Sequence, residues 1–167
     1  MTALTDAILD LFTPAEAIPI VTVAARLFLA LLLGALIGWE REVKSRAAGL
    51  RTHMLIAMAA AMFTIVAMEL TIFPGTTETT LRVDPLRLIE AVTAGVAFLA
   101  AGSIITSGGN VRGLTTGASM WLAGAIGLAC GTGDGVLAVL GTGLALITLW
   151  MIRVVVKPLL PEPDEKD

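Results

Sequence analysis

Apolar residues gather in five long runs along the chain, and short polar connections separate the runs. A helix rises about 1.5 Å per residue, so about 20 apolar residues cross the roughly 30 Å hydrocarbon core of a bilayer. The runs have about this length and cover residues 19–39, 52–73, 86–106, 114–130 and 135–156. The pattern predicts an all-α fold, a polytopic transmembrane helix bundle with about five spans.

The two ends of the chain differ from this apolar middle. Residues 1–18 contain acids and no Lys or Arg, so they lack the basic region that opens a cleavable secretory signal. We expect them to form an outer N-terminal segment. Residues 158–167 combine prolines with acids, which predicts a flexible cytoplasmic tail. Residues 19–157 then form one transmembrane domain.

Composition narrows the function classes. Hydrophobic residues make up 56% of the chain and charged residues 15%, against about 25% charged in ordinary soluble domains. The net charge of -3 argues against nucleic acid as a partner. The apolar composition indicates the lipid bilayer as the partner of this chain. One cysteine and one histidine can make neither an intrachain disulfide nor a histidine cluster for a metal. The usual nucleophile and base combinations of hydrolases are also missing, so we do not expect an enzyme.

The distribution of Lys and Arg predicts the orientation in the membrane. Cytoplasmic connections carry the excess of these residues in most membrane proteins. With five spans, one side holds two of them, Arg82 and Arg87, and the other holds eight: Arg41, Lys44, Arg46, Arg51, Arg112, Arg153, Lys157 and Lys166. We therefore expect the N-terminus outside and the C-terminus inside, and we name the two ends of the bundle the outer end and the basic end.

Small residues recur at a spacing of four. They form three pairs, Gly34 and Gly38, Ala57 and Ala61, and Ala97 and Ala101, and a ladder in two parts, Gly109, Gly113 and Gly117, then Ala123, Gly127, Gly131 and Gly135. Such stripes let helices approach closely inside lipid. They predict close packing, either in the interior of the bundle or at an interface between protomers. They also exceed what one small bundle needs, so we expect a homo-oligomer, most simply a two-fold dimer.

Two ionisable residues lie within the runs at membrane depth. Arg26 and Glu90 lie about 10 Å and about 6 Å inside the outer ends of the first and third runs. A charge at the centre of a helix costs about 2.5 to 3.5 kcal/mol on insertion scales, so it needs a partner or water. We predict an ion pair between these two residues. The alternative is that each side chain reaches the headgroups by itself.

Acidic residues cluster toward the same outer end, and they are Glu69, Asp84, Glu90 and Asp134. Carboxylate oxygens suit hard cations, so a weak, shallow Mg²⁺ site is chemically permitted there, although no other cofactor is indicated. The alternative is helix capping, because acids at helix starts and in glycine turns commonly cap the next helix.

The connection after the first run mixes acids and bases, and it suits contact with anionic lipid headgroups. Glu40 and Arg41 lie at the end of the first run, where they could form a lock with Arg51 or Arg112 from neighbouring connections. Those two arginines are also close to hydroxyl groups and to the first N–H groups of the next helices, which can hold a carboxylate or phosphate. The hydroxyl groups belong to Thr52, Thr115 and Thr116.

Three strings, in order and at the expected spacing, resemble a known family. They are GALIGWEREVKSRAAGLRTHMLIAMAAAMF, DPLRLIEAVTAGVAFLAAGSII and VRGLTTGASMWLAGAIGLACGTG. The chain is similar to the MgtC/SapB family of membrane proteins, in a short form with the membrane domain only. The resemblance implies, position by position, that the polar residues of the family motifs are here Glu40, Arg41, Glu42, Arg51, Thr52, His53, Asp84, Arg87, Arg112, Thr115 and Thr116.

The resemblance implies a bacterial inner-membrane protein associated with growth in low magnesium, with virulence and, for some members, with inhibition of ATP synthase. Two function classes follow. One is a regulatory or interaction protein that contacts another membrane complex or a second copy of itself. The other is a channel or transporter for Mg²⁺ or another cation. The small-residue stripes favour the first, because transporters typically show broken helices or internal repeats. Only residues 107–117, rich in glycine, are a candidate for a broken helix.

Overall fold

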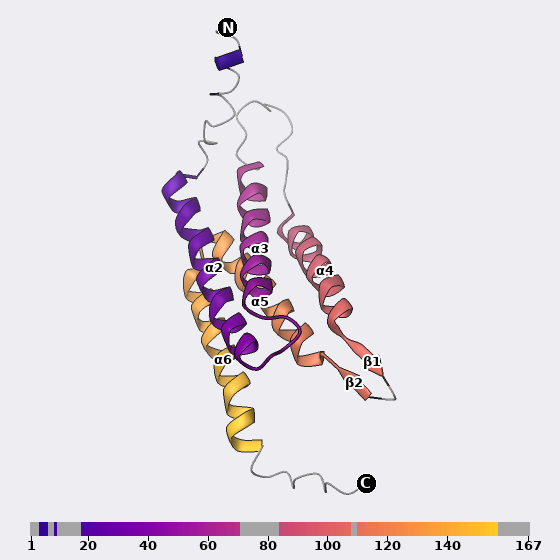
Figure 1. The fold of residues 1–167 in the computed structure, drawn as a ribbon. Helices are drawn as coiled ribbons and strands as arrows, with labels where there is room; N and C mark the ends of the chain where they lie inside the picture. The colour runs from indigo at the N-terminus through magenta and orange to yellow at the C-terminus, as the bar shows by residue number, and fades with distance from the viewer. Residues whose placement is uncertain (1–3, 7–8, 10–17, 71–83, 108–109, 157–167) are drawn as a thin grey trace, which may run out of the picture.

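The computed structural model describes residues 4–6, 9, 18–70, 84–107 and 110–156, and it shows a bundle of long helices (Figure 1). The helices are α2 (Ile20–Val43), α3 (Leu50–Leu70), α4 (Pro85–Ser103), α5 (Leu114–Thr132) and α6 (Gly135–Val156). Two short strands, β1 (Ile105–Ser107) and β2 (Asn110–Arg112), lie between α4 and α5. The predicted all-α bundle is confirmed, with this small hairpin added to it.

The lengths of the helices agree with a multi-pass membrane protein. Helices α2, α3, α4 and α5 are each long and apolar enough to cross a membrane. Within the described residues, the apolar stretch of α6 is shorter and covers Gly135–Met151. The outer segment and the tail predicted at residues 1–18 and 158–167 lie almost entirely outside the described residues. The N-out and C-in orientation stays a prediction.

Helix α2 continues beyond the predicted end of the first apolar run. The apolar pattern ends at Trp39, but α2 reaches Val43. Its last turn is stabilised by an ion pair between Glu40 and Lys44, which are four residues apart and therefore adjacent on the helix surface. The charged end of α2 thus remains helical where it leaves the apolar region.

Helix α4 ends at Ser103, earlier than the third apolar run, which was predicted to continue to Thr106. After Ser103 the chain turns into the antiparallel hairpin, in which Ile105 lies opposite Arg112, Thr106 opposite Val111 and Ser107 opposite Asn110. The β-branched residues here favour strand over helix. The two residues between the strands are both glycine, a sequence typical of tight hairpins.

The predicted ladder of glycines does not continue as one helical stripe at Gly113, and its first residue, Gly109, lies outside the described residues. Gly113 is the N-cap of α5 with φ +90°, a backbone conformation that favours glycine. An added Cβ there would collide with the carbonyl oxygen of Ser103. Instead of a broken helix over residues 107–117, the described part of this segment consists of strand residues, the Gly113 turn and the first turn of α5.

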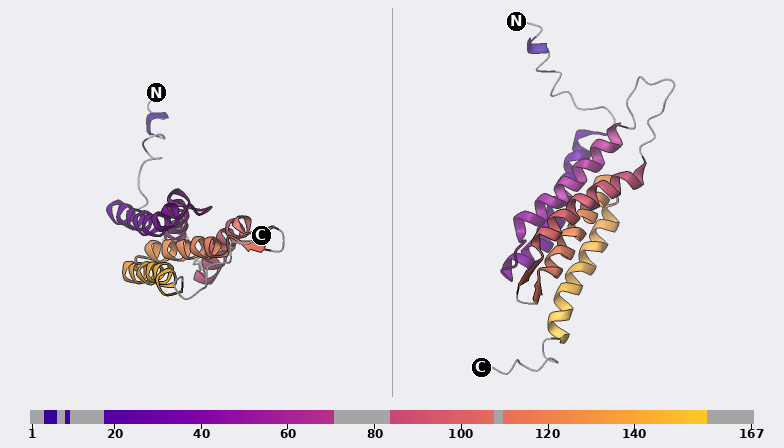
Figure 2. Two further views of the ribbon diagram at one scale, coloured as in Figure 1. Left: turned by 60° about the horizontal axis from the view of Figure 1, so that its bottom comes forward. Right: turned by 90° about the vertical axis from the view of Figure 1, so that its right-hand side faces the viewer.

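Helix α5 lies at the centre of the bundle. It packs against α2, α3, α4 and α6, whereas α3 and α4 touch each other only slightly. Figure 2 shows α4 at the side of the bundle, next to α5. One apolar core joins α2, α3, α5 and α6, and a second lies between α3, α4 and α5. Helix α4 packs on α5 along one side, and most of its remaining surface is exposed.

The glycine pair of α2 packs directly on the backbone of α3. An added Cβ at Gly34 would lie 2.7 Å from the carbonyl oxygen of His53, and one at Gly38 would lie 2.7 Å from the Cα of Leu50. Both distances are too short for real side-chain atoms, so close approach of the helices requires glycine here. The predicted role of this pair in close packing is confirmed.

The glycines of α5 make a similar contact with α3. An added Cβ at Gly127 would lie 2.7 Å from the Cβ of Ala60, and one at Gly131 would lie 2.8 Å from the carbonyl oxygen of Ala61. The alanine pair of α4 differs, because Ala97 and Ala101 are exposed. These two alanines do not pack in the interior of the bundle, so for them the prediction of a protomer interface stays a prediction.

Candidate functional site

Polar side chains from three helices meet at the basic end of the bundle. The end of α2 supplies Glu40 and Arg41, the start of α3 supplies His53, and the start of α5 supplies Thr116 and Ser119. All except Glu40, which is half-buried, are buried. We call these five residues the polar cluster.

His53 is the most deeply buried residue of the polar cluster, with 0% of its surface exposed. Its Nδ1 lies 2.8 Å from the carbonyl oxygen of Gly49, and its Nε2 lies 3.0 Å from the Oγ of Ser119. A carbonyl oxygen can only accept, so Nδ1 carries a proton and donates it. In the neutral ring Nε2 then accepts the hydroxyl proton of Ser119. His53 thereby connects α3 to α5.

The Ser119 hydroxyl has two acceptors within reach. Besides His53, its Oγ lies 2.8 Å from the carbonyl oxygen of Thr116. A hydroxyl has one proton, so donation to Thr116 competes with donation to the imidazole. The hydroxyl can therefore switch between the two acceptors without any movement of the helices.

Arg41 connects α2 to the same part of α5. Its Nη2 donates to the Oγ1 of Thr116 at 3.4 Å, and its Nη1 lies 3.6 Å from a carboxylate oxygen of Glu40. Only 4% of Arg41 is exposed. Glu40 also pairs with Lys44, so one carboxylate faces two cations. Charges buried in this way need such compensation, because an unpaired buried charge costs several kcal/mol.

Glu42 holds the start of α3. Its Oε2 accepts a hydrogen bond from the backbone N–H of Leu50 at 2.9 Å. This N–H has no partner within α3, and a carboxylate is favourable at the positive end of a helix. Gly49 leaves the space that this carboxylate occupies, since an added Cβ at Gly49 would collide with it.

The predicted lock of Glu40 and Arg41 with Arg51 or Arg112 is wrong. Arg51 and Arg112 are exposed, and Thr115 is exposed as well, while Thr52 is half-buried. Glu40 finds its cations near it in the sequence, because it pairs with Arg41 and with Lys44, which lies one turn further along. The guanidinium of Arg41 contacts Glu40 and Thr116 rather than a residue of the neighbouring connections.

The predicted ion pair between Arg26 and Glu90 is also wrong. Arg26 lies on α2, and its Nη1 donates to the carbonyl oxygen of Gly131 at 2.8 Å. It lies 3.9 Å from the sulfur of Met68. Gly131 belongs to the last turn of α5, where carbonyls lack helical partners and a cation is favourable. Glu90 is exposed on α4, which packs mainly against α5.

This geometry changes the expected effect of substitutions at the outer end. We expect Arg26→Met to lower stability by about 1 to 2 kcal/mol, because it removes a charged hydrogen bond and a helix-end interaction. Glu90→Gln serves as the control and should change stability little. The measurement is thermal unfolding in detergent of both single variants and the double variant. A double variant that departs from the sum by more than about 0.5 kcal/mol would contradict this assignment.

Two of the four predicted cation ligands are helix caps. A carboxylate oxygen of Asp84 accepts from the N–H of Leu86 at 3.0 Å, and one of Asp134 accepts from the N–H of Leu137 at 2.9 Å. Glu69 is half-buried near the end of α3. Among the residues that the structure describes, no three His, Cys, Asp or Glu side chains gather as a metal site would need. Capping is confirmed for both aspartates.

An exposed stripe on α4 remains. Glu90, Ala94, Ala97 and Ala101 follow one another at spacings of four, three and four, which places them on one side of the helix. All four residues are exposed, and so is Arg87, one turn before Glu90. We call these five residues the Glu90 face.

Comparison with known proteins agrees with the sequence resemblance. The MgtC family model matches residues 27–157. Protein MgtC of Brucella abortus strain 2308 is 41% identical over 115 residues, which cover 69% of this chain and 44% of that protein. Protein MgtC of Salmonella typhimurium strain 14028s is 44% identical over 108 residues, which cover 65% and 42% respectively. The match thus spans less than half the length of these relatives. No solved structure matches the chain.

Proposed function

The chain belongs to the MgtC family, and we propose that it is a regulatory or interaction protein of the bacterial inner membrane. In this proposal it acts by binding another membrane protein rather than by catalysing a reaction. The family resemblance supports a role in adaptation to low magnesium or in virulence. It also suggests ATP synthase as one partner complex.

The exposure of Glu90 carries the proposal. Glu90 lies five residues into α4, about 8 Å from its first residue. Among the described residues it forms no ion pair, and its side chain faces away from the bundle. A carboxylate at this position is costly in lipid unless a partner pairs with it. The three alanines of the same face let a partner helix approach closely.

A second copy of the chain is one partner that suits the Glu90 face. Arg87 and Glu90 have opposite charges and lie one turn apart on this face. A two-fold axis parallel to α4 brings Arg87 of one copy toward Glu90 of the other, and the reverse pair forms by symmetry. This self-complementary arrangement supports the homo-oligomer, most simply a two-fold dimer.

Cation transport is the alternative function, and the interior of the bundle favours it less. The hydrogen bonds and ion pairs of the polar cluster are formed within the chain, while the Nε of Arg41 and the two carboxylate oxygens of Glu40 have no hydrogen-bond partner in the described region. A groove of about 770 Å³ between α3 and α4, which opens at the side of the bundle, is lined by apolar residues. A transport path needs ionisable or oxygen-bearing side chains near the middle of the membrane.

Site-specific photocrosslinking in cells tests the proposal. A photoreactive residue in place of Ala94 should give a protein crosslink, and Glu90→Leu should reduce it several-fold. The matched control is Leu144, which is exposed on α6 and lies nine residues from the start of its helix, as Ala94 does. Equal crosslinking from both positions would contradict the proposal. Mg²⁺ or H⁺ flux into proteoliposomes that Glu90→Gln abolishes would favour transport instead.

A further inference from the structure

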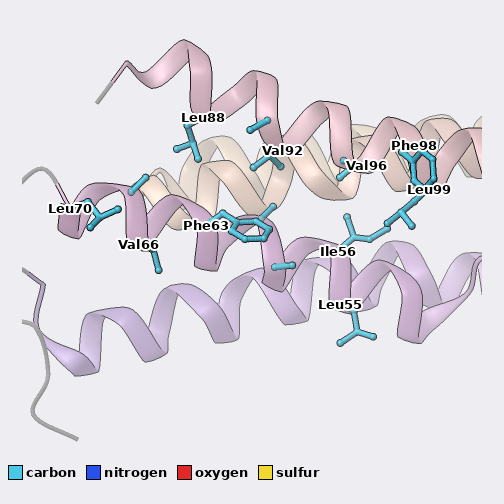
Figure 3. Close-up of a pocket in the computed structure, with 15 residues that line it drawn as sticks. Leu55, Ile56, Phe63, Val66, Leu70, Leu88, Val92, Val96, Phe98 and Leu99 are labelled. Carbon is cyan, nitrogen blue, oxygen red and sulfur yellow. The ribbon is translucent and has the colours of Figure 1, made fainter. Parts of the chain in front are cut away.

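An apolar groove runs between α3 and α4, and the close-up in Figure 3 shows side chains of both helices along it. On α3 its wall extends from Leu55 to Leu70, about 22 Å along the helix axis. On α4 it extends from Leu88 to Leu99. The volume of about 770 Å³ lies where the two helices make few contacts. The groove is therefore long and narrow, and it opens sideways toward the lipid.

The protein itself does not fill this groove. An added Cβ at Gly95 would meet no atom within 4 Å, and Phe63 and Phe98 on its two walls are 61% and 80% exposed. Apolar atoms that face a void lose their dispersion contacts, so a groove of this size needs an occupant. Both phenylalanines make the apolar surface of the groove uneven, and a flexible acyl chain can follow such a surface.

Charge differs between the two ends of the groove. At the basic end, Arg51 lies one turn before Leu55 on α3, and Arg112 lies opposite Ile105, two residues after the end of α4. Both arginines are exposed. The outer end carries more acids than bases, with Glu69 next to Leu70, Asp84 at the start of α4, and one arginine, Arg87, next to Leu88. Basic residues between transmembrane helices favour anionic headgroups.

We propose that the α3–α4 groove is a binding site for an anionic phospholipid. Its acyl chains lie along the apolar walls, and its phosphate lies at the basic end with Arg51 and Arg112. Glu90 itself is two residues from both Leu88 and Val92 of the groove wall and points to the other side of α4. The groove nevertheless adjoins the Glu90 face, because Ala91 and Phe98 of its wall lie one turn from Arg87 and Ala94. Lipid binding is therefore measured directly, apart from the crosslinking that tests the proposed function.

Lipid titration of the detergent-solubilised protein tests this proposal. The probes are phosphatidylglycerol and phosphatidylcholine with identical acyl chains, and the readouts are bound lipid by native mass spectrometry and the shift in Tm. Wild type should prefer phosphatidylglycerol. The preference should fall about fivefold for each of Arg51→Gln and Arg112→Gln. Arg46→Gln, an exposed arginine of the same end, is the control and should keep it.

A second variant tests the acyl-chain part of the site. Gly95→Leu should fill the groove and weaken binding of both lipids. Gly141→Leu on α6 is its matched control, because an added Cβ there also meets nothing within 4 Å. Phosphatidylglycerol preference that survives in the double arginine variant would overturn the proposal. It would also be overturned if Gly95→Leu changed the number of subunits and left lipid binding intact, since a helix of a second copy would then occupy the groove.

Discussion

Gly127→Ala should destabilise the protein by about 2 to 3 kcal/mol, although it adds only one methyl group. The added Cβ would lie 2.7 Å from the Cβ of Ala60 and 2.9 Å from the carbonyl carbon of Ala57, and it would collide with the carbonyl oxygen of Ala57. These are atoms of the α3 backbone or next to it, so no side-chain rotation relieves the overlap. Helices α3 and α5 must move apart. Thermal unfolding in detergent measures the loss.

Gly141→Ala is the matched control for this prediction. It makes the same chemical change in α6, where the added Cβ meets no atom within 4 Å. Alanine favours helix over glycine by about 1 kcal/mol, so this variant should be as stable as wild type or slightly more stable. Similar losses in both variants would show that the close contact of α3 and α5 does not limit stability.

The bundle could be predicted from the sequence because the length of an apolar run reports directly on a membrane span. The close contacts at Gly34, Gly38 and Gly127 followed from the same kind of pattern, since only small residues permit them. Segment boundaries were harder to predict. The sequence pattern extended the third run to Thr106, because isoleucine and threonine are compatible with both a helix and a strand. Pairing with β2 decides between them.

The candidate site was predicted only in part. The family resemblance provided Arg41, His53 and Thr116 but not their contacts, which depend on how three helices pack. Ser119, the partner of His53, was missed. The available signal was its spacing of three from Thr116, which places both on one side of α5.

The partner of Arg26 was missed for a different reason. We searched for an opposite charge, and Arg26 instead binds a backbone carbonyl, which every residue has. A weaker signal was present in Gly133, which has φ +92° and marks the end of α5 at the outer end. The C-terminal end of a helix attracts a cation. The N-terminal end attracts an anion in the same way, and Asp84 and Asp134 each cap the start of the helix that follows them.

Glu40→Gln should produce the largest electrostatic loss in the bundle, about 3 kcal/mol or more. Glu40 is the carboxylate that pairs with both Arg41 and Lys44. Without its charge, Arg41 keeps only the hydrogen bond to Thr116, while 4% of its surface reaches solvent. A buried cation without a counter-charge is costly, so α2 should separate from α5 at the basic end. Thermal unfolding in detergent measures this loss.

The mechanism of the loss can be tested with a second substitution. If the unpaired cation is the cause, Arg41→Met in the Glu40→Gln background should recover stability, since it removes the buried charge and keeps an apolar chain of similar length. Arg46→Met in the same background is the control, and it should recover nothing because Arg46 is exposed. Equal recovery by both substitutions would indicate a general effect of net charge. A further loss with Arg41→Met would show that the hydrogen bond to Thr116 outweighs the cost of the buried guanidinium.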